Sequence, residues 1–423
     1  MPAGVHLHGV GRTRVHLRPS GQPGIQVSGS AAQTRVQGLA VEDATGVGIA
    51  AAGAALRLED VAVENTLAQA GVAPGHGVQV NQGATLELFG CRIAGNAGVG
   101  IHATGIGKVT IIDPLFAPPA TGATIGIIDP LFVPKSEVVQ NQGGGIAIID
   151  PLFLKADTTD DGSLLLQATD VRDNRRFGVA LYGAGARLVR TAIRGTQKGA
   201  GDLAEGLLVA AGKHAAATPG VNIDAGSAIH GNGRAGVLVL GAAKVEVSGD
   251  LSHNLHGGLW AQGKASEVTL TKTARLFQNT SVGIAVTAGA KLVVDGARIE
   301  KTLARDFKAK NGGKSGEVGD GIGVFGKASA KVNNAQLLGN VRAAIIGHDV
   351  ALRSDGSPDL TVTGSVMQGG KYGIVLNGSY GAKATAAAMA PSNDFQGVGE
   401  STADNGDLPV ETELCSGDCS HEP

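Results

Sequence analysis

GVLVLGAAKVEVSGDLSHN, residues 236–254, contains one complete structural unit of this chain. VLVL reads as a strand, a glycine turn follows, KVEV alternates as a second strand, and DLSH forms a third before the closing asparagine. From Asn232 to Asn254 the spacing is 22 residues. Three short strands at this spacing are typical of one coil of a right-handed parallel β-helix, whose coils pair about 4.8 Å apart.

The closing asparagine recurs along the chain. Three residues, a small residue and then Val, Ile or Leu follow it at Asn96, Asn141, Asn174, Asn232, Asn254, Asn279 and Asn340. Five more sites keep the small and aliphatic pair without the asparagine, at Gly48, Gly77, Gly206, Gly321 and Gly373. These sites predict an all-β solenoid of about twelve coils over residues 1–380, with three short strands per coil.

A structural role explains the repeated asparagine. At one fixed turn of successive coils, its side-chain amide can bond to the asparagine above and to the one below. We also expect it to adopt the left-handed backbone that such a turn needs. The seven asparagines are therefore predicted to form an internal amide ladder and not a ligand site.

The repeats resemble the pectin-lyase-like superfamily over residues 1–380. More narrowly, they resemble right-handed β-helix repeat proteins of Gram-negative soil bacteria such as myxobacteria, which are predicted to be exported. The superfamily includes polysaccharide lyases, hydrolases, epimerases, tailspikes and adhesins. The resemblance therefore implies a fold and an exported, cell-surface or extracellular location, and it leaves the function open.

Composition limits the classes of partner. Glycine accounts for 67 of 423 residues, about twice the usual ~7%, and the formal net charge is −2. This charge gives no general attraction to nucleic acid, and no apolar run reaches the ~20 residues of a membrane-spanning helix. The chain has no signal peptide and begins with strand-like alternation, so we expect its true start to lie upstream.

Three cysteines carry different expectations. Cys91 is predicted to be a small buried hydrophobe. Cys415 and Cys419 lie near the C-terminus, and the sequence leaves open whether they form a local disulfide or remain two free thiols. No zinc site follows from two cysteines alone.

The hexapeptide IIDPLF occurs three times between residues 111 and 153. Removing residues 112–135 shortens the spacing from Asn96 to Asn141 from 45 to 21, and removing 149–159 shortens that from Asn141 to Asn174 from 33 to 22. Both segments are therefore predicted to be loops inserted into complete coils. Three interpretations remain: duplicated passengers, flaps that pack on the solenoid, and a docking patch made of Phe116, Phe132 and Phe153.

Three long turns interrupt the solenoid at every fourth coil. They run from Val63 to Gly77, from Ile193 to Gly206 and from Ile299 to Gly321. Each carries a threonine near its start and a polar residue before its final glycine. These six residues form the candidate binding edge, which would suit a long repetitive ligand such as a glycan: Thr66, Thr196, Thr302, His76, Glu205 and Asp320. The alternative is that one turn simply tolerates expansion.

No catalytic constellation emerges from the sequence. Hydrolases on this fold need clustered carboxylates, and lyases need Ca²⁺-binding acids with a Lys or Arg base near the substrate carbon. The best acidic cluster is Asp157, Asp160 and Asp161, which would bind Ca²⁺ or form a solvated loop. No other cofactor is implied. Aromatic residues are 3% of the chain, which argues against a sugar-stacking groove.

The C-terminal part, residues 381–423, is predicted to hold a capping segment and an acidic disordered tail. We expect a non-enzymatic exported scaffold or adhesin-like surface protein that presents loops along one edge, with a polysaccharide or another surface protein as its partner. The alternative is a polysaccharide lyase or glycoside hydrolase on the same fold. Neither reading fixes an oligomeric state.

Overall fold

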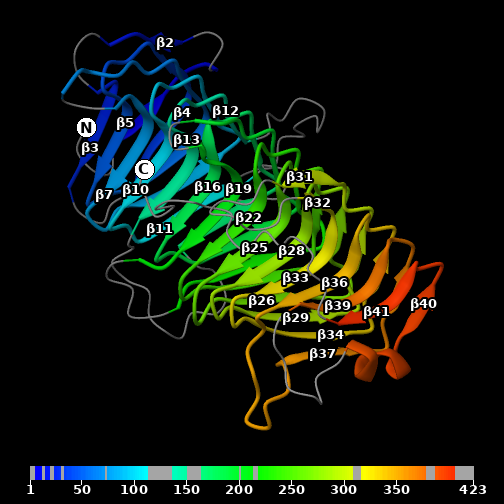
Figure 1. Cartoon of the computed structure of the whole chain (residues 1–423). Helices are drawn as coiled ribbons and strands as arrows, with labels where there is room; N and C mark the ends of the chain where they lie inside the picture. Colours follow the sequence, from blue (N-terminus) through cyan, green and yellow to red (C-terminus); the bar gives the residue numbers. More distant parts are fainter. Residues whose placement is uncertain are drawn as a thin grey trace, which may run out of the picture. The chain divides into compact units, whose positions relative to one another are not determined.

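The computed structural model describes residues 5–11, 15–19, 23–29, 33–71, 74–112, 136–149, 163–199, 202–212, 218–307, 316–377 and 386–404. Two compact units divide these residues. Unit 1 runs to Leu207 and includes Ala211–Gly220, whereas unit 2 includes Leu208–Ala210 and continues from Val221. Both units are right-handed parallel β-helices, so the predicted fold class is confirmed (Figure 1).

Most coils of unit 1 place one strand in sheet A and two short strands in sheet B, whereas β4 (Thr34–Glu42) and β6 (Ala55–Glu64) each run as one long strand of sheet B. The sheet A strands are β3 (Ile25–Ser28), β5 (Val47–Ala52), β7 (His76–Asn81), β10 (Val99–Thr104), β13 (Gly144–Ile149) and β16 (Arg176–Tyr182). The sheet B strands are β1 (His6–His8), β2 (His16–Leu17), β4 (Thr34–Glu42), β6 (Ala55–Glu64), β8 (Thr85–Phe89), β9 (Arg92–Ala94), β11 (Lys108–Ile112), β12 (Glu137–Val139), β14 (Leu164–Gln167), β15 (Asp170–Arg172), β17 (Ala186–Val189) and β18 (Ala192–Arg194). Strand β19 (Ala204–Ala210) lies at the division between the units.

Unit 2 follows the same plan. Its sheet A strands are β22 (Ala235–Leu240), β25 (Gly257–Gln262), β28 (Val282–Thr287), β33 (Asp320–Phe325), β36 (Ala343–His348), β39 (Tyr372–Asn377) and β41 (Glu400–Asp404). Its sheet B strands are β20 (Gly220–Ile223), β21 (Ala228–His230), β23 (Lys244–Val247), β24 (Asp250–Ser252), β26 (Glu267–Leu270), β27 (Arg275–Phe277), β29 (Lys291–Asp295), β30 (Arg298–Glu300), β34 (Ser329–Asn333), β35 (Gln336–Leu338), β37 (Leu360–Thr363), β38 (Val366–Gln368) and β40 (Asp394–Gln396). A 3-10 helix, η3 (Ala386–Ser392), precedes the last two strands. Strands β31 (Arg305–Phe307) and β32 (Gly316–Val318) form an antiparallel hairpin.

Stacked aliphatic side chains form the core of each unit. The parallel register aligns one inward residue from each sheet A strand with its counterpart in the next coil. These side chains are fully buried: Ile49, Val78, Ile101, Ile146 and Val179 in unit 1, and Val237, Leu259, Ile284, Ile322, Ile345 and Ile374 in unit 2. Burial stabilises each by about 1.5–3 kcal/mol relative to exposure, which is why the aliphatic residue recurs in every repeat.

The small residue of each repeat has a steric cause. A Cβ atom added to Gly100 would lie 2.7 Å from Asn141 Nδ2 and 2.8 Å from the carbonyl oxygen of Gly145 in the next coil. Gly258 is equally confined, with the Gly283 oxygen at 2.6 Å and Asn279 Nδ2 at 2.7 Å. The glycine therefore leaves the space that the amide of the next coil occupies.

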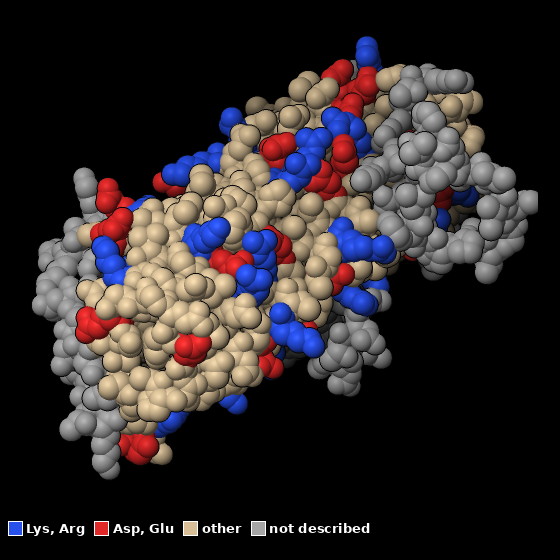
Figure 2. All heavy atoms as spheres, turned by 90° about the vertical axis from the view of Figure 1, so that its right-hand side faces the viewer, with Lys and Arg blue, Asp and Glu red and all other residues tan. Residues whose placement is uncertain are grey.

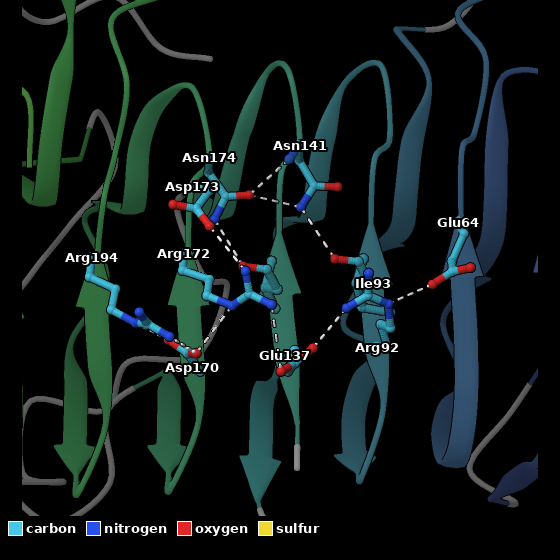
Figure 3. Close-up of polar contacts among 11 residues, drawn as sticks. Glu64, Arg92, Ile93, Glu137, Asn141, Asp170, Arg172, Asp173, Asn174 and Arg194 are labelled. Carbon is cyan, nitrogen blue, oxygen red and sulfur yellow. Dashed lines mark hydrogen bonds and ion pairs between the residues drawn. The ribbon is translucent and has the colours of Figure 1, made fainter. Parts of the chain in front are cut away.

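Six of the seven asparagines make the amide-to-amide hydrogen bonds that an internal ladder requires, whereas Asn340 bonds to the backbone of Ile299 and Thr302. In unit 1, Asn96 Nδ2 donates to Asn141 Oδ1 at 2.8 Å. Asn141 Nδ2 donates in turn to Asn174 Oδ1 at 2.9 Å (Figure 3). In unit 2, the distance from Asn232 Nδ2 to Asn254 Oδ1 is 2.9 Å and that from Asn254 Nδ2 to Asn279 Oδ1 is 3.0 Å. Each Oδ1 also accepts the backbone N–H of the preceding asparagine.

One detail of the predicted turn is wrong. None of the seven asparagines has a positive φ. The left-handed residue is the one immediately before the asparagine: Gly95, Gln140, Asp173, Gly231, His253, Gln278 and Gly339. A left-handed residue reverses the chain at that point, and the asparagine after it directs its amide inward along the stack of coils.

The predicted end of the solenoid at residue 380 is too early. Strand β40 pairs in parallel with β38, and β41 pairs in parallel with β39, so residues 394–404 add one more coil. Helix η3 lies within the predicted capping segment, but it leads into this additional coil. The rest of the expected tail, with Cys415 and Cys419, lies outside the described residues.

Both IIDPLF segments lie between strands that pair with the strands of neighbouring coils. Ile112 and Ile149 are the last residues of β11 and β13. Strand β11 pairs with β8 and β14, and β12, which follows the first segment, pairs with β9 and β15. Phe116, Phe132 and Phe153 lie outside the described residues, as do Asp157, Asp160 and Asp161.

Candidate functional site: the outer face of sheet A in unit 1

Polar side chains gather on the outer face of sheet A where β7 and β10 lie side by side. Gln79 pairs with His102 and Asn81 pairs with Thr104, and all four point away from the aliphatic core. Asn81 therefore lies diagonally across from His102 on one surface. We call these four residues the polar face. Gln79, Asn81 and His102 are half-buried and Thr104 is exposed.

A second histidine, His76, stacks against His102 of the polar face. The rings of His76 and His102 stack with centroids 4.5 Å apart and an angle of 2° between their planes. His76 Nδ1 accepts the backbone N–H of Val99 at 3.0 Å, so Nε2 carries the proton of the neutral ring. A Cβ atom at Gly98 would lie 2.8 Å from His76 Nδ1, so this glycine gives the imidazole its space.

Two polar atoms of this face have no protein partner. Asn81 Oδ1 and His102 Nδ1 are buried, and neither makes a hydrogen bond. A buried polar atom without a partner costs about 1–3 kcal/mol, so native structures rarely leave one without a reason. Both atoms are shielded from solvent, whereas the rest of each side chain is half-exposed, so a hydroxyl group of a bound molecule would reach them after a small shift of the Asn81 and His102 side chains.

Burial also keeps both imidazoles neutral. Burial and, to a smaller extent, the proximity of His102 lower the pKa of His76 to about 4. Burial likewise lowers the pKa of His102. At neutral pH the polar face therefore presents an unprotonated imidazole, which is the form that can accept a proton.

Unit 2 repeats the unpaired atoms on its own part of sheet A. Trp260 Nε1 and Gln262 Oε1 both belong to β25, are buried, and make no hydrogen bond. They lie two residues apart on the outer side of the strand, whereas the inward Leu259 joins the aliphatic core. The sole tryptophan of the chain thus lies on the same side of sheet A as the histidine pair does in unit 1.

The structure buries all six residues of the predicted binding edge, which corrects that prediction. Thr66 and Thr302 take the place of an asparagine in the ladder, where their N–H groups donate to Asn96 Oδ1 and Asn340 Oδ1. Thr196 and Glu205 are buried in the same way in unit 1. A loop residue that lies inside the wall of a solenoid cannot present its side chain to a glycan.

Asp320 has a structural task at the third long turn. Its Oδ1 accepts Arg342 Nε at 2.8 Å and the N–H of Ala343 at 3.2 Å. Arg342 Nη2 binds the other carboxylate oxygen, and Arg342 Nη1 reaches the carbonyl of Glu317 in the hairpin. This pair fastens the long turn to the next coil.

An ion-pair ladder covers the short strands of unit 1 (Figure 3). Arg92 bridges Glu64 at 2.7 Å and Glu137 at 2.8 Å, so one cation satisfies two acids from neighbouring coils. The series continues through Arg172 and Asp170 to Arg194. On the face drawn in Figure 2, positive and negative side chains are likewise interspersed, so no single sign dominates there.

Among the described residues, no group of three or more His, Cys, Asp or Glu side chains could hold a metal ion. Cys91 is buried, as predicted, and its thiol donates to the carbonyl oxygen of Leu58 at 3.4 Å. Within the same part of the chain, no helix is long and apolar enough to cross a membrane.

Neither sequence comparison gives a relative: no protein-family model matches the chain, and no curated protein matches it. Two solved structures are similar to it. The mannuronan C-5 epimerase AlgE4 A-module of Azotobacter vinelandii has 13% identity and a TM-score of 0.34, over 95% of this chain and 87% of that one. The catalytic domain of a GH87 α-1,3-glucanase, solved with tetrasaccharides, has 11% identity and a TM-score of 0.34, over 87% and 64%. At these values the likeness concerns the fold alone, and no functional argument rests on it.

Proposed function

We propose that this β-helix is a carbohydrate-active protein and that a glycan binds across the polar face of unit 1. The observation that carries the proposal is the pair of unsatisfied atoms, Asn81 Oδ1 and His102 Nδ1. Sugars offer a high density of hydroxyl groups, which can donate to one such atom and accept from another. An exported location, expected from the sequence, fits a polysaccharide ligand.

Within this class, the enzymatic alternative takes precedence over the non-enzymatic scaffold. His102 is neutral and half-buried, and the parallel stack on His76 fixes its ring. A base so positioned can remove a proton from a sugar carbon next to a carboxyl group, which is the first step of a lyase reaction. His76 would act as a positioning residue, because its own Nδ1 is occupied by Val99 N–H.

Hydrolysis fits the polar face less well. Glycoside hydrolases use two carboxyl groups separated by about 5–9.5 Å. The outward residues of β5, β7, β10 and β13 include no Asp or Glu: they are Ala50, Ala52, Gln79, Asn81, His102, Thr104, Ala147 and Ile149. Of the groups that a lyase needs, the polar face supplies a base, His102 in place of the expected Lys or Arg, and no Ca²⁺-binding acid. Of the groups that a hydrolase needs it supplies neither carboxyl, so the lyase is the better candidate of the two.

A depolymerisation screen tests this function. The purified chain is incubated with acidic and neutral polysaccharides, and unsaturated products are followed by absorbance while new reducing ends are assayed separately. We expect unsaturated products from an acidic polysaccharide and a loss of turnover of about 100-fold or more in His102→Ala. His6→Ala changes an exposed histidine on sheet B of unit 1 and should keep most of the activity.

The other results of this screen have distinct meanings. Reducing ends without unsaturated products would replace the lyase with a hydrolase. Binding without any product, weakened by Asn81→Ala, would return the protein to the non-enzymatic class expected from the sequence. If no polysaccharide is bound or cleaved, the carbohydrate function is overturned.

A further inference from the structure

Two arginines lie one coil apart on the short strands of unit 2. Arg275 of β27 pairs in register with Arg298 of β30, and Phe277 pairs with Glu300. Both arginine side chains point outward, 45% and 50% exposed, at a coil spacing of about 4.8 Å. Like charges directly opposite each other in a sheet repel, so this arrangement needs a compensating group.

A single carboxylate provides that compensation. Glu300 Oε2 accepts Arg275 Nε at 2.9 Å, and Glu300 Oε1 accepts Arg298 Nη2. The Glu300 side chain is only 8% exposed, so it lies behind the guanidinium groups and leaves their outer edges to solvent. Burial tends to raise the pKa of Glu300, but the hydrogen bonds from both arginines outweigh it and lower the pKa. One further acid, Asp250, lies 3.9 Å from Arg275 Nη1.

Phe277 positions a third cation. Its ring centroid is 4.3 Å from the Arg275 guanidinium carbon and 5.6 Å from Lys301 Nζ. His253 meets the same ring edge-on at 5.5 Å. Lys301 has no carboxylate within 4 Å among the described residues. We call Arg275, Phe277, Arg298 and Lys301 the basic platform.

The same strands of unit 1 lack such a surplus of cations. Arg92 has two carboxylate partners, and Arg172 has three. On the basic platform, Arg275 and Arg298 share the buried Glu300, Asp250 approaches only Arg275, and Lys301 binds neither acid. The guanidinium edge of Arg298 and the ammonium of Lys301 are therefore left for an external anion.

We propose that the basic platform binds carboxylate or sulfate groups carried by an acidic polysaccharide. A guanidinium offers two parallel N–H donors that match the planar oxygens of either group, and Lys301 adds a compact charge beside it. The platform belongs to sheet B, so it is a separate site from the polar face. It rests on the proposed function only in taking the ligand to be a polysaccharide.

Binding to three hexasaccharides tests the platform in the full chain. The probes are a galacturonate hexamer, a sulfated galactan hexamer and a neutral galactose hexamer, titrated at low and physiological salt. We expect Arg298→Gln to weaken the anionic hexamers about tenfold and to reduce the salt dependence, while the neutral hexamer is unaffected. Gln can still donate to Glu300, so the local fold is retained. Arg298→Lys should recover part of the loss.

A matched control comes from the same unit. Lys291 of β29 is exposed but lies 3.8 Å from Glu267, so Lys291→Gln should change the affinity by no more than about twofold. Equal affinity in wild type and in the Arg298→Gln, Lys301→Gln double variant would overturn the platform, as would an equal loss for the neutral hexamer. The His102→Ala variant separates the two proposals, because it should lose turnover while keeping its response to Arg298→Gln.

Discussion

The imidazole rings of His76 and His102 stack in parallel, 4.5 Å apart, although 26 residues separate them in the chain. Their strands, β7 and β10, are neighbours in sheet A, and a full coil of chain runs between them. The stack is compatible with two neutral rings and is opposed by two charged ones. The structure of the polar face therefore depends on pH.

Acidification should destabilise unit 1 through His76. Burial, followed by the nearby His102, lowers the pKa of His76 from 6.5 to about 4. Between these values the unfolded chain takes up a proton that the folded chain does not, so the free energy of unfolding falls as the pH falls. The loss amounts to roughly 3 kcal/mol and is complete below about pH 4.

Chemical denaturation at pH 7 and pH 4.5 measures this effect. In His76→Asn the amide oxygen can still accept the N–H of Val99, but the titrating group is gone. The variant should therefore lose less stability on acidification than the wild type. An unchanged pH dependence would show that His76 is not responsible.

Breaking the amide ladder at its middle should cost more than losing one surface hydrogen bond. Asn254→Ala removes the acceptor of Asn232 Nδ2 and the donor to Asn279 Oδ1, and leaves buried groups unsatisfied. We expect a loss of about 2–5 kcal/mol in the free energy of unfolding. Asn222→Ala is the control, because Asn222 bonds only to Glu246 at the surface and should change the stability by about 0.5 kcal/mol or less. Similar losses in both variants would mean that the amide ladder contributes no more to stability than a surface hydrogen bond does.

The repeat can be predicted from the sequence because each coil needs the same residue types at the same positions. A buried amide needs Asn, the space beside it needs Gly, and the core next to it needs an aliphatic side chain. All twelve predicted sites coincide with sheet A strands, from β5 at Gly48 to β39 at Gly373. Where one of these demands is missing, sequence reasoning failed: β41 reads ESTAD, which is polar enough to look disordered, yet its backbone pairs with β39.

The candidate site is harder to predict from the sequence, because its residues meet only through the pairing of neighbouring coils. The side-chain alternation of β10 places His102 on the outer face. His76 ends a long turn, so the sequence predicts it on an exposed edge. Only the register between coils brings the two rings together. The basic platform is similar, since Arg275 and Arg298 are adjacent through pairing and not through sequence. A repeat shows which coil a residue belongs to, but the contacts between coils need the register.

A methyl group added at Gly258, a glycine of the repeat, tests how closely the backbones of neighbouring coils pack. Gly258→Ala would place a Cβ atom 2.6 Å from the Gly283 carbonyl oxygen, which is backbone and cannot move aside. We expect a loss of about 1–3 kcal/mol in the free energy of unfolding. A Cβ atom at Gly220 meets nothing within 4 Å, so Gly220→Ala should be close to neutral. A harmless Gly258→Ala would mean that neighbouring coils can separate locally.

Removing Asp320 alone from its buried ion pair with Arg342 should reduce the free energy of unfolding more than replacing both residues does. The side chains of Asp320 and Arg342 are each 4% exposed, so Asp320→Ala leaves an uncompensated guanidinium inside unit 2. The expected loss is about 3–5 kcal/mol in the free energy of unfolding. Replacing both, with Asp320→Ala and Arg342→Met, removes the charges together and should recover part of that loss. Thermal or urea unfolding of the two variants measures the difference. If the double variant is as unstable as the sum of the single changes, then Arg342 contributes through its contacts with the hairpin backbone at Glu317 and not through Asp320.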